Sequence, residues 1–252
     1  MRRHTARTKQ HRRNTGMAVR LLTMAALVAV ILICMLIFFK IGTITVEGSQ
    51  HYTEEEIATA SGLSVGDNLV MLNKTVAASK IKAWLPYVED VKIRRKLPNQ
   101  LTITVTECEA AGAAVSESGS WWSLDSNCKL LEETTAEEAK KYPVLSGVVL
   151  TAPVSGCAAS AADPEQITVA QTLLTAMEQW DLVDVITTVD LSKLYGIVLW
   201  YGDRFEIDLG STDNLAYKIQ YLQEILKNLN DGQSGVIDLT FETEMVARFL
   251  PW

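Results

Sequence analysis

The longest hydrophobic run in the chain lies near its start. Residues 21–39 are 19 positions without a charge, and a helix of that length spans roughly 28 Å at about 1.5 Å per residue. This is close to the roughly 30 Å thickness of the bilayer hydrocarbon core. A signal peptide usually has a shorter apolar core, followed by a cleavage site of small residues, whereas this run continues as FFKIGTITV. The pattern predicts an uncleaved transmembrane helix.

The segment that follows combines alternating strand patterns with two helical ones. ITVEG alternates as a short strand does. Thr53 and Glu56 form the signature of a capping box, Gly62 supplies a helix stop, and a second helix is expected over residues 74–84. Apolar residues then alternate on both sides of a turn at residues 97–99, which predicts an antiparallel hairpin with one buried face. The expected order is β-α-α-β-β, a three-stranded sheet with two helices on one face.

The remainder of the chain also mixes strand and helix patterns. Hairpins are expected around residues 125–127 and 202–203, because alternating apolar segments flank both turns. Asp163 and Pro164 mark a helix start after an Ala/Ser-rich loop, and Leu215 begins an amphipathic helix. The last expected strand is VIDLTF, residues 236–241.

These elements predict an α+β protein with five regions. The second folded domain is expected to be built on an antiparallel sheet with flanking helices. The regions are a basic arm (1–20), a transmembrane helix (21–39), the β-α-α-β-β domain (40–109), the second, β-rich domain (110–241) and a short tail (242–252).

The charge differs on the two sides of the apolar run. The first 40 residues carry eight Lys and Arg and no acidic residue, which leaves 15 basic and 30 acidic residues for the rest of the chain. Lys and Arg are enriched on the cytoplasmic side of membrane helices. The N-terminus is therefore predicted to be cytoplasmic and residues 40–252 to lie outside. The basic arm has no aromatic residue for base stacking, so it is interpreted as an orientation signal and no nucleic-acid partner is expected.

The sequence offers no convincing catalytic or metal-binding arrangement. Beyond the apolar run there is one histidine, His51, on which a Ser-His-Asp or Cys-His site would depend. Cys108, Cys128 and Cys157 lack the paired spacing of zinc ligands. A Cys128–Cys157 disulfide and three buried free thiols both fit the pattern. No catalytic residue, metal, cofactor or small-molecule substrate is predicted.

Two adjacent tryptophans, Trp121 and Trp122, leave a further alternative open. Aromatic faces bind carbohydrate, so the pair would suit a sugar platform. Neighbouring strand residues point to opposite faces, however. One core and one surface tryptophan are therefore expected.

Three motifs carry a resemblance to a known family. They are ITVEGSQHYTEEEI, GLSVGDNLVMLN and LPYVEDVKIRRKLPNQLTITVTE, in this order within residues 44–107. Together they resemble the POTRA domain of the FtsQ/DivIB family of bacterial cell-division proteins. VDLSKLYGIVLWYGDRFEIDLGSTDNLAYKIQYLQEILKNL and GVIDLTF resemble the second, β-rich domain of that family. The resemblance covers nearly the whole chain. It implies a non-enzymatic, single-pass scaffold of the divisome, located in the plasma membrane at the division septum.

The resemblance also implies partners and a docking mode. In this family the late strands of the β domain and the nearby helix receive the extracytoplasmic part of the FtsB/DivIC partner, and FtsL joins the complex. If residues 236–241 lie at a sheet edge, their unpaired backbone groups can accept an added strand. The candidate partner-binding residues are Val236, Asp238, Thr240 and Phe241 on the strand, and Tyr217 and Tyr221 on the preceding helix.

A second candidate surface is the cluster of cations before the turn at residues 97–99. Arg94, Arg95 and Lys96 are a possible contact for an acidic partner or for lipid headgroups. They also fit a solvated edge that discourages aggregation. Two other functions remain as alternatives: a POTRA-type envelope assembly or chaperone factor that binds secreted polypeptides, and a wall-active enzyme.

Overall fold

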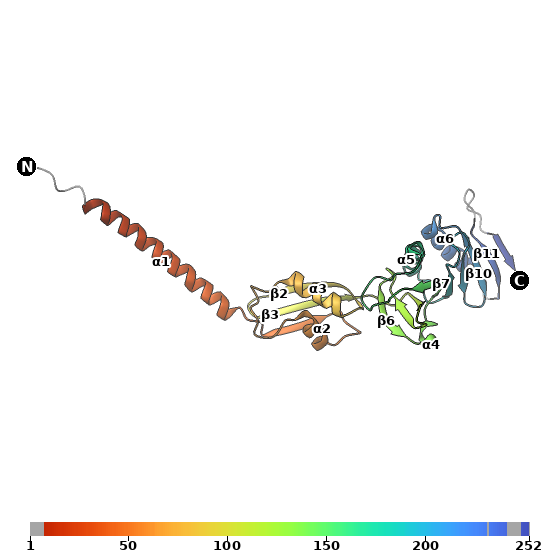
Figure 1. The fold of residues 1–252 in the computed structure, drawn as a ribbon, viewed down its shortest axis with the longest axis horizontal. Coiled ribbons are helices and arrows are strands. Elements are labelled where there is room, and N and C mark those ends of the chain that lie inside the picture. Colours follow the sequence, from red (N-terminus) through yellow and green to blue (C-terminus); the bar gives the residue numbers. More distant parts are fainter. Residues whose placement is uncertain (1–7, 231, 241–247, 252) are drawn as a thin grey trace, which may run out of the picture. The chain divides into compact units, whose positions relative to one another are not determined.

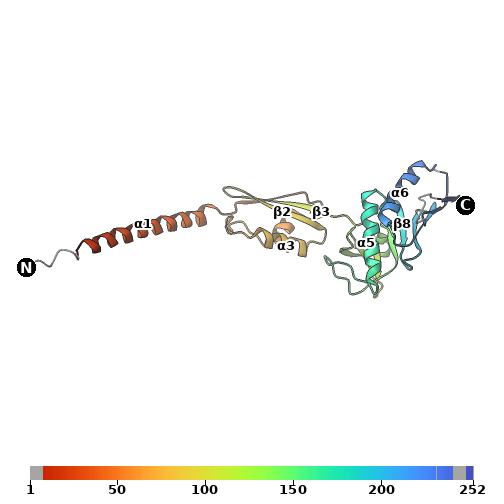
Figure 2. The same cartoon turned by 90° about the horizontal axis from the view of Figure 1, so that it is seen from above.

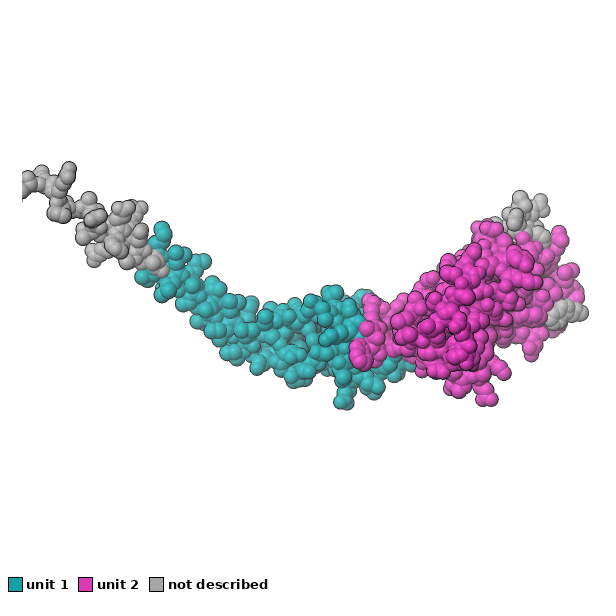
Figure 3. Space-filling view, viewed as in Figure 1, with its two compact units in different colours: residues 1–81, 91–105 teal, residues 82–90, 106–252 magenta. Residues whose placement is uncertain are grey.

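The computed structural model describes residues 8–230, 232–240 and 248–251. The chain divides into two compact units (Figure 3). Unit 1 comprises residues 1–81 and 91–105, and unit 2 comprises residues 82–90 and 106–252.

The chain begins with the long helix α1, Thr8–Phe38 (Figure 1). Its segment Val19–Phe38 has 20 residues, a mean hydropathy of 3.0 and no residue buried by the rest of the protein. A helix that is apolar all round is stable only when something buries it, either a protein core or a membrane. Because no protein core covers this one, it is consistent with a single-pass membrane protein.

Unit 1 has the expected β-α-α-β-β order. Its three-stranded sheet has the order β1-β3-β2, with β1 parallel to β3. The elements are β1 (Thr43–Glu47), α2 (Glu54–Ser61), α3 (Lys74–Trp84), β2 (Val88–Lys96) and β3 (Gln100–Glu107). The two helices and the hairpin of β2 and β3 can be followed in Figures 1 and 2.

Local capping signals set the helix ends in unit 1. The Glu56 backbone N–H donates to Thr53 Oγ1 (3.3 Å), and the Thr53 N–H donates back to Glu56 Oε2 (2.8 Å). The Thr53 N–H, and then the Thr53 hydroxyl, which donates to the same Oε2 (2.8 Å), lower the pKa of the Glu56 carboxyl. Gly62 ends α2 in the left-handed conformation, with φ of 68°, which glycine adopts without steric cost. Asn73 Oδ1 accepts from the Val76 N–H at the start of α3 (3.2 Å). The predicted capping box and glycine stop of α2 are therefore confirmed.

Residues 82–90 belong to unit 2, and two of them are hydrogen-bonded to other residues of that unit. Tyr87 Oη donates to Glu132 Oε1 (2.7 Å), and Lys129 Nζ donates to the Val88 carbonyl (3.3 Å). Burial, and then the neighbouring Glu132 carboxylate, raise the pKa of Tyr87. The phenol is thus held as a neutral donor.

Unit 2 is built on a nine-stranded sheet with the order β12-β11-β10-β9-β8-β7-β4-β5-β6. Its strands are β4 (Gly112–Ser116), β5 (Trp121–Leu124), β6 (Leu130–Thr134), β7 (Val144–Leu150), β8 (Ile186–Asp190), β9 (Ile197–Tyr201), β10 (Phe205–Gly210), β11 (Gly235–Asp238) and β12 (Arg248–Pro251). Its helices are α4 (Ala136–Ala139), α5 (Pro164–Gln179) and α6 (Leu215–Asn228).

The α+β class is confirmed, but the sheet of unit 2 is mixed and not purely antiparallel. β7 and β8 run parallel, and so do β10 and β11. Helix α5 lies between the first two strands in sequence, and α6 between the second two. A helical crossover returns the chain to the same end of the sheet and so makes its strands parallel. The sequence pattern had placed the helices correctly without revealing that they are crossovers.

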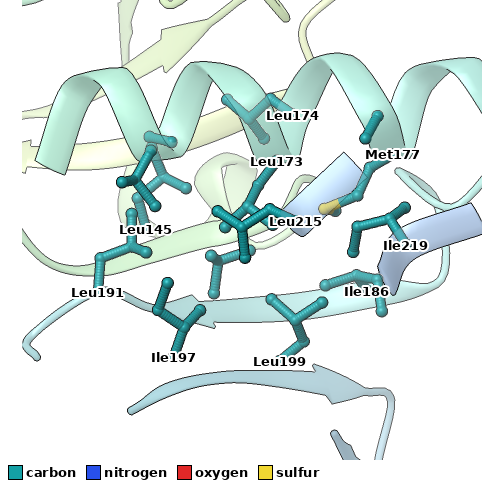
Figure 4. Packing of buried hydrophobic residues seen from close by; sticks show 14 of the residues in the cluster. Leu145, Leu173, Leu174, Met177, Ile186, Leu191, Ile197, Leu199, Leu215 and Ile219 are labelled. Carbon is teal, nitrogen blue, oxygen red and sulfur yellow. The ribbon is translucent and has the colours of Figure 1, made fainter. Parts of the chain in front are cut away.

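The core of unit 2 lies between this sheet and helices α5 and α6. Figure 4 shows Leu173 and Met177 of α5 pointing toward Ile186 and Leu199 of the strands, with Ile219 of α6 beside them. All five side chains are buried. Helix α5 begins as predicted, with Pro164 in its first turn and Asp163 Oδ1 accepting from the Glu165 N–H (3.0 Å).

All four cysteines are free thiols. Cys108 and Cys128 are buried, whereas Cys157 is exposed. Burial raises the pKa of Cys108, and it raises that of Cys128 to about 12. Both buried thiols are therefore protonated at neutral pH and act as small core side chains. Cys128 and Cys157 thus form no disulfide, and the three outer thiols are not all buried. The structure therefore matches neither of the two arrangements that the sequence left open.

The packing of α5 gives a direct test of where the core of unit 2 lies. Leu173→Ala should lower the free energy of unfolding by roughly 2–5 kcal/mol, since it deletes a fully buried side chain and leaves a cavity. Urea denaturation of the detergent-solubilised full chain, followed by tryptophan fluorescence, measures the loss. The matched control is Gln171→Ala, an exposed position on the same helix, which should change stability by less than about 0.5 kcal/mol. Equal stability of the two variants would contradict this core.

Candidate partner-binding surfaces

The strand within residues 236–241, considered above as a possible sheet edge, is not at the edge. Strand β11 pairs in parallel with β10 on one side and antiparallel with β12 on the other. It is also shorter than predicted, covering residues 235–238 instead of 236–241. The segment 242–252 had been interpreted as a tail, but its residues 248–251 form the strand that covers β11.

β11 ends in a local turn made by two of the predicted contact residues. Asp238 Oδ1 accepts from the Thr240 N–H (3.0 Å) and from Thr240 Oγ1 (2.7 Å). The Leu239 N–H donates to the Asp208 carbonyl (2.8 Å). Phe241, another predicted contact residue, lies outside the described residues. The contact role of this group stays a prediction, but the condition that its strand lies at a sheet edge is not met.

The edge strand at this end of the sheet is β12. Its Phe249 lies on the core side, with its ring centroid 6.2 Å from that of Phe205. Successive strand residues alternate between faces, so Leu250 lies on the opposite face, where 56% of its surface is exposed. Leu250 is the cross-strand partner of Val236. Val236 therefore lies next to the edge strand, one strand inward.

Gly235 is needed for β12 to approach β11. A Cβ at this position would lie 2.2 Å from the Leu250 carbonyl oxygen, a distance that real Cβ atoms do not tolerate. The loop that leads into β11, the strand next to the edge, is held by Arg204. Its Nη2 donates to the Asn230 carbonyl (2.9 Å), and its guanidinium lies 5.0 Å from the centre of the Phe205 ring. Gly235 and Arg204 thus help to position β11 so that β12 can pair with it.

At the opposite edge of the sheet, the Ala/Ser-rich loop is bonded to the start of β6. The Leu130 N–H donates to the Cys157 carbonyl (2.8 Å), and the Gly156 N–H donates to the Leu130 carbonyl (2.7 Å). Ser155 Oγ donates to the Leu131 carbonyl. The loop therefore occupies backbone groups of the first two residues of β6, with which this strand would otherwise accept a foreign strand.

Tyr217 and Tyr221 lie together on α6. Their rings are stacked, with centroids 6.4 Å apart and an interplanar angle of 17°. Tyr221 packs partly against the core, and Tyr217 is exposed. The two rings form a small aromatic surface, of the kind enriched at protein interfaces.

The three cations of the hairpin have different roles. The Arg95 guanidinium donates to the Leu72 carbonyl, in the loop between α2 and α3, and its Nε is buried without a hydrogen-bond partner. Arg94 and Lys96 are exposed. Arg95 is thus partly committed to holding that loop, whereas Arg94 and Lys96 remain candidates for an external contact.

The described residues contain no cluster of three or more His, Cys, Asp and Glu side chains able to hold a metal ion.

Trp122 packs against the core of unit 2, and its Nε1 donates to Ser120 Oγ (3.1 Å). Trp121 is half-buried. The two tryptophans therefore do not present one flat aromatic platform.

The fold and surfaces define a class: a protein with one membrane-spanning candidate helix, a β-α-α-β-β unit and a sheet-rich unit. Comparison with known proteins gives the family. Residues 39–107 match the POTRA domain of FtsQ type, and residues 113–240 match the C-terminal domain of the cell division protein FtsQ/DivIB. The chain belongs to the FtsQ/DivIB family of cell-division proteins.

Several curated proteins are similar over most of their length. The cell division protein DivIB of Clostridium botulinum (strain Hall) is 27% identical over 207 residues, which is 81% of this chain and 80% of the relative. The cell division protein FtsQ of Corynebacterium glutamicum is 26% identical over 196 residues, 77% of this chain and 81% of the relative. FtsQ of Geobacter sp. (strain M21) is 26% identical over 218 residues, 83% and 76% of the two chains.

The different roles of the hairpin cations can be measured. Arg95→Ala should lower the free energy of unfolding of the full chain by about 1–3 kcal/mol, because it frees a carbonyl bonded by a charged donor. Its neighbour provides the control: Arg94→Ala should change stability by less than about 0.5 kcal/mol. Thermal or urea unfolding in detergent compares the two. A loss that is equal in both variants would show that Arg95 does not hold the loop.

Proposed function

We propose that this protein is a non-enzymatic scaffold of the bacterial division machinery, anchored in the plasma membrane at the septum by α1. Membership of the FtsQ/DivIB family supports a role in cell division. The exposed apolar helix Val19–Phe38 supports the anchor. Seven Lys and Arg precede the apolar run, and Lys40 follows it closely. This asymmetry supports a cytoplasmic N-terminus and extracytoplasmic POTRA and β domains.

The observation that carries the binding mode is the position of β12 at the end of the nine-stranded sheet. No other described strand pairs with its outer side. An extended segment of a partner can add to such an edge, with backbone hydrogen bonds setting its register and side chains giving selectivity. We place the docking of an FtsB/DivIC-like partner here, with an FtsL-like protein in the same complex.

The other end of the sheet is a poorer docking site, because residues 155–157 already bond β6. On the favoured edge, Leu250 and Val236 form an apolar pair on the face away from Phe249. The stacked Tyr217 and Tyr221 offer an additional contact. Asp238 and Thr240 are secondary candidates, because they bond one another.

The proposed edge can be tested with a charged substitution. Leu250→Glu places a carboxylate at the exposed apolar position of β12, where an added strand would have to desolvate it. The variant should recover about tenfold less of the FtsB/DivIC-like and FtsL-like proteins, as expected for loss of a central contact. The full chain, tagged at its N-terminus, is purified in detergent from the native host, and bound proteins are identified by mass spectrometry.

The matched control is Val149→Glu, since Val149 is a comparably exposed apolar residue (42%) on the interior strand β7. Its partner recovery should equal that of the wild type, and both variants should keep the wild-type circular dichroism spectrum. Undiminished recovery with Leu250→Glu would move the docking site away from β12. Recovery of many unrelated secreted chains would favour an envelope assembly factor over a division scaffold.

A further inference from the structure

At one end of unit 1, the loop between α2 and α3 is hydrogen-bonded to the last turn of α1 and to the residues just after it. The Leu69 N–H donates to the Phe39 carbonyl and the Ile41 N–H donates to the Asp67 carbonyl, both at 2.8 Å. Asn68 Nδ2 donates to the Met35 carbonyl (3.2 Å), in the last turn of α1. The loop between α2 and α3 is therefore attached to residues that lie inside the apolar helix.

The turn of the β2–β3 hairpin lies at the same end. β1 and β3 run parallel, and their register pairs Thr43 with Gln100. The Gly42 N–H also donates to the Asn99 carbonyl (2.7 Å). Because Gly42 follows the anchor by only a few residues, the turn at residues 97–99 must lie close to the level at which α1 ends.

Exposed apolar side chains gather on these two segments. Val65, Met71 and Leu97 are 67%, 74% and 66% exposed, and Val70 is exposed too. A single exposed apolar residue on a protein surface needs no explanation. Four of them on two segments next to the end of α1 need one, because the 20-residue segment Val19–Phe38 is long enough to span the hydrocarbon core, so that its end would lie at the headgroups.

The charges around these segments match a phospholipid surface. Lys40, Arg94 and Lys96 are exposed near this end of unit 1. The nearby acid, Asp67, is also exposed, and its carboxylate accepts from the Ser64 N–H (2.8 Å). Apolar tips flanked by cations are the arrangement by which a protein enters the headgroup region, with cations at the phosphates and apolar groups below them.

We propose that the loop of residues 63–72 and the turn of residues 97–99 form a membrane-proximal collar that inserts into the headgroup layer of the bilayer. Met71, Val65 and Leu97 enter the upper acyl region, and Lys40 and Lys96 bind lipid phosphates. Arg95 is a positioning residue, because it bonds the Leu72 carbonyl and so joins the loop to the hairpin. This inference rests on the proposed anchoring of α1.

The experiment is lipid quenching of a fluorophore on the full chain in phosphatidylcholine vesicles, with and without phosphatidylglycerol. Cys34→Ala and Cys157→Ser leave only the two buried cysteines, and a nitrobenzoxadiazole label is then attached at Met71→Cys or at Leu97→Cys. The matched control is Glu55→Cys, exposed in the first turn of α2, at the other end of that helix from Gly62. Doxyl-labelled lipids should quench positions 71 and 97 several-fold more than position 55.

A second label separates failure of the collar from failure of the anchor. In a variant that keeps Cys34 and carries Cys157→Ser, the label lies within α1. Quenching at Cys34 with equal, weak quenching at positions 71, 97 and 55 would overturn the collar and leave the anchor intact. Absence of quenching at Cys34 would overturn the anchor itself, and the collar with it.

The contribution of charge is tested in the same vesicles. Lys96→Glu should reduce the quenching at position 97 several-fold in vesicles that contain phosphatidylglycerol, because the new carboxylate repels anionic headgroups. Thr45→Glu, an exposed position in β1, should leave it unchanged. Unchanged quenching in Lys96→Glu would overturn the assignment of this lysine to lipid phosphate.

Discussion

The backbone groups at the two edges of the nine-stranded sheet impose the constraint on which the organisation of unit 2 depends. An edge strand presents unpaired N–H and C=O groups that must be covered, solvated or bonded by another chain. At the start of β6 the protein bonds them itself, with the Gly156 and Cys157 backbone and the Ser155 hydroxyl. At β12 no described strand does so. This asymmetry between the edges, more than any single side chain, is the basis for proposing that a partner strand adds at β12.

The position of β12 follows from contacts further inside the sheet. Helix α6 is a crossover that returns the chain parallel to β10, so β11 lies between β10 and β12. Arg204 fixes the loop before β11 through the Asn230 and Gln233 carbonyls. Gly235 then allows the close approach of Leu250. The four-residue edge strand β12 is held by its pairing with β11 and by the packing of Phe249 on Phe205.

The sequence predicted the features whose causes lie within a few residues of one another. Thr53 with Glu56 caps α2, and Asp163 with Pro164 starts α5, since each signal and its effect share one helical turn. What the sequence did not predict depends on partners far along the chain. β12 is short and exists through its pairing with β11. The polar loop that contains Cys157 resembles a simple connection until its bonds to Leu130 are known.

The roles of the cations in the β2–β3 hairpin also depend on a residue far along the chain and could not be read from the sequence. Arg94, Arg95 and Lys96 form one basic patch in the sequence, but the structure divides them. Arg95 bonds the Leu72 carbonyl, 23 residues earlier in the chain, while its neighbours stay exposed. The parallel register of β1 and β3 then brings this end of the hairpin to the level at which α1 ends. A lipid contact would use unit 1 and a partner strand would use β12 of unit 2, so each surface rests on hydrogen bonds that the other does not share.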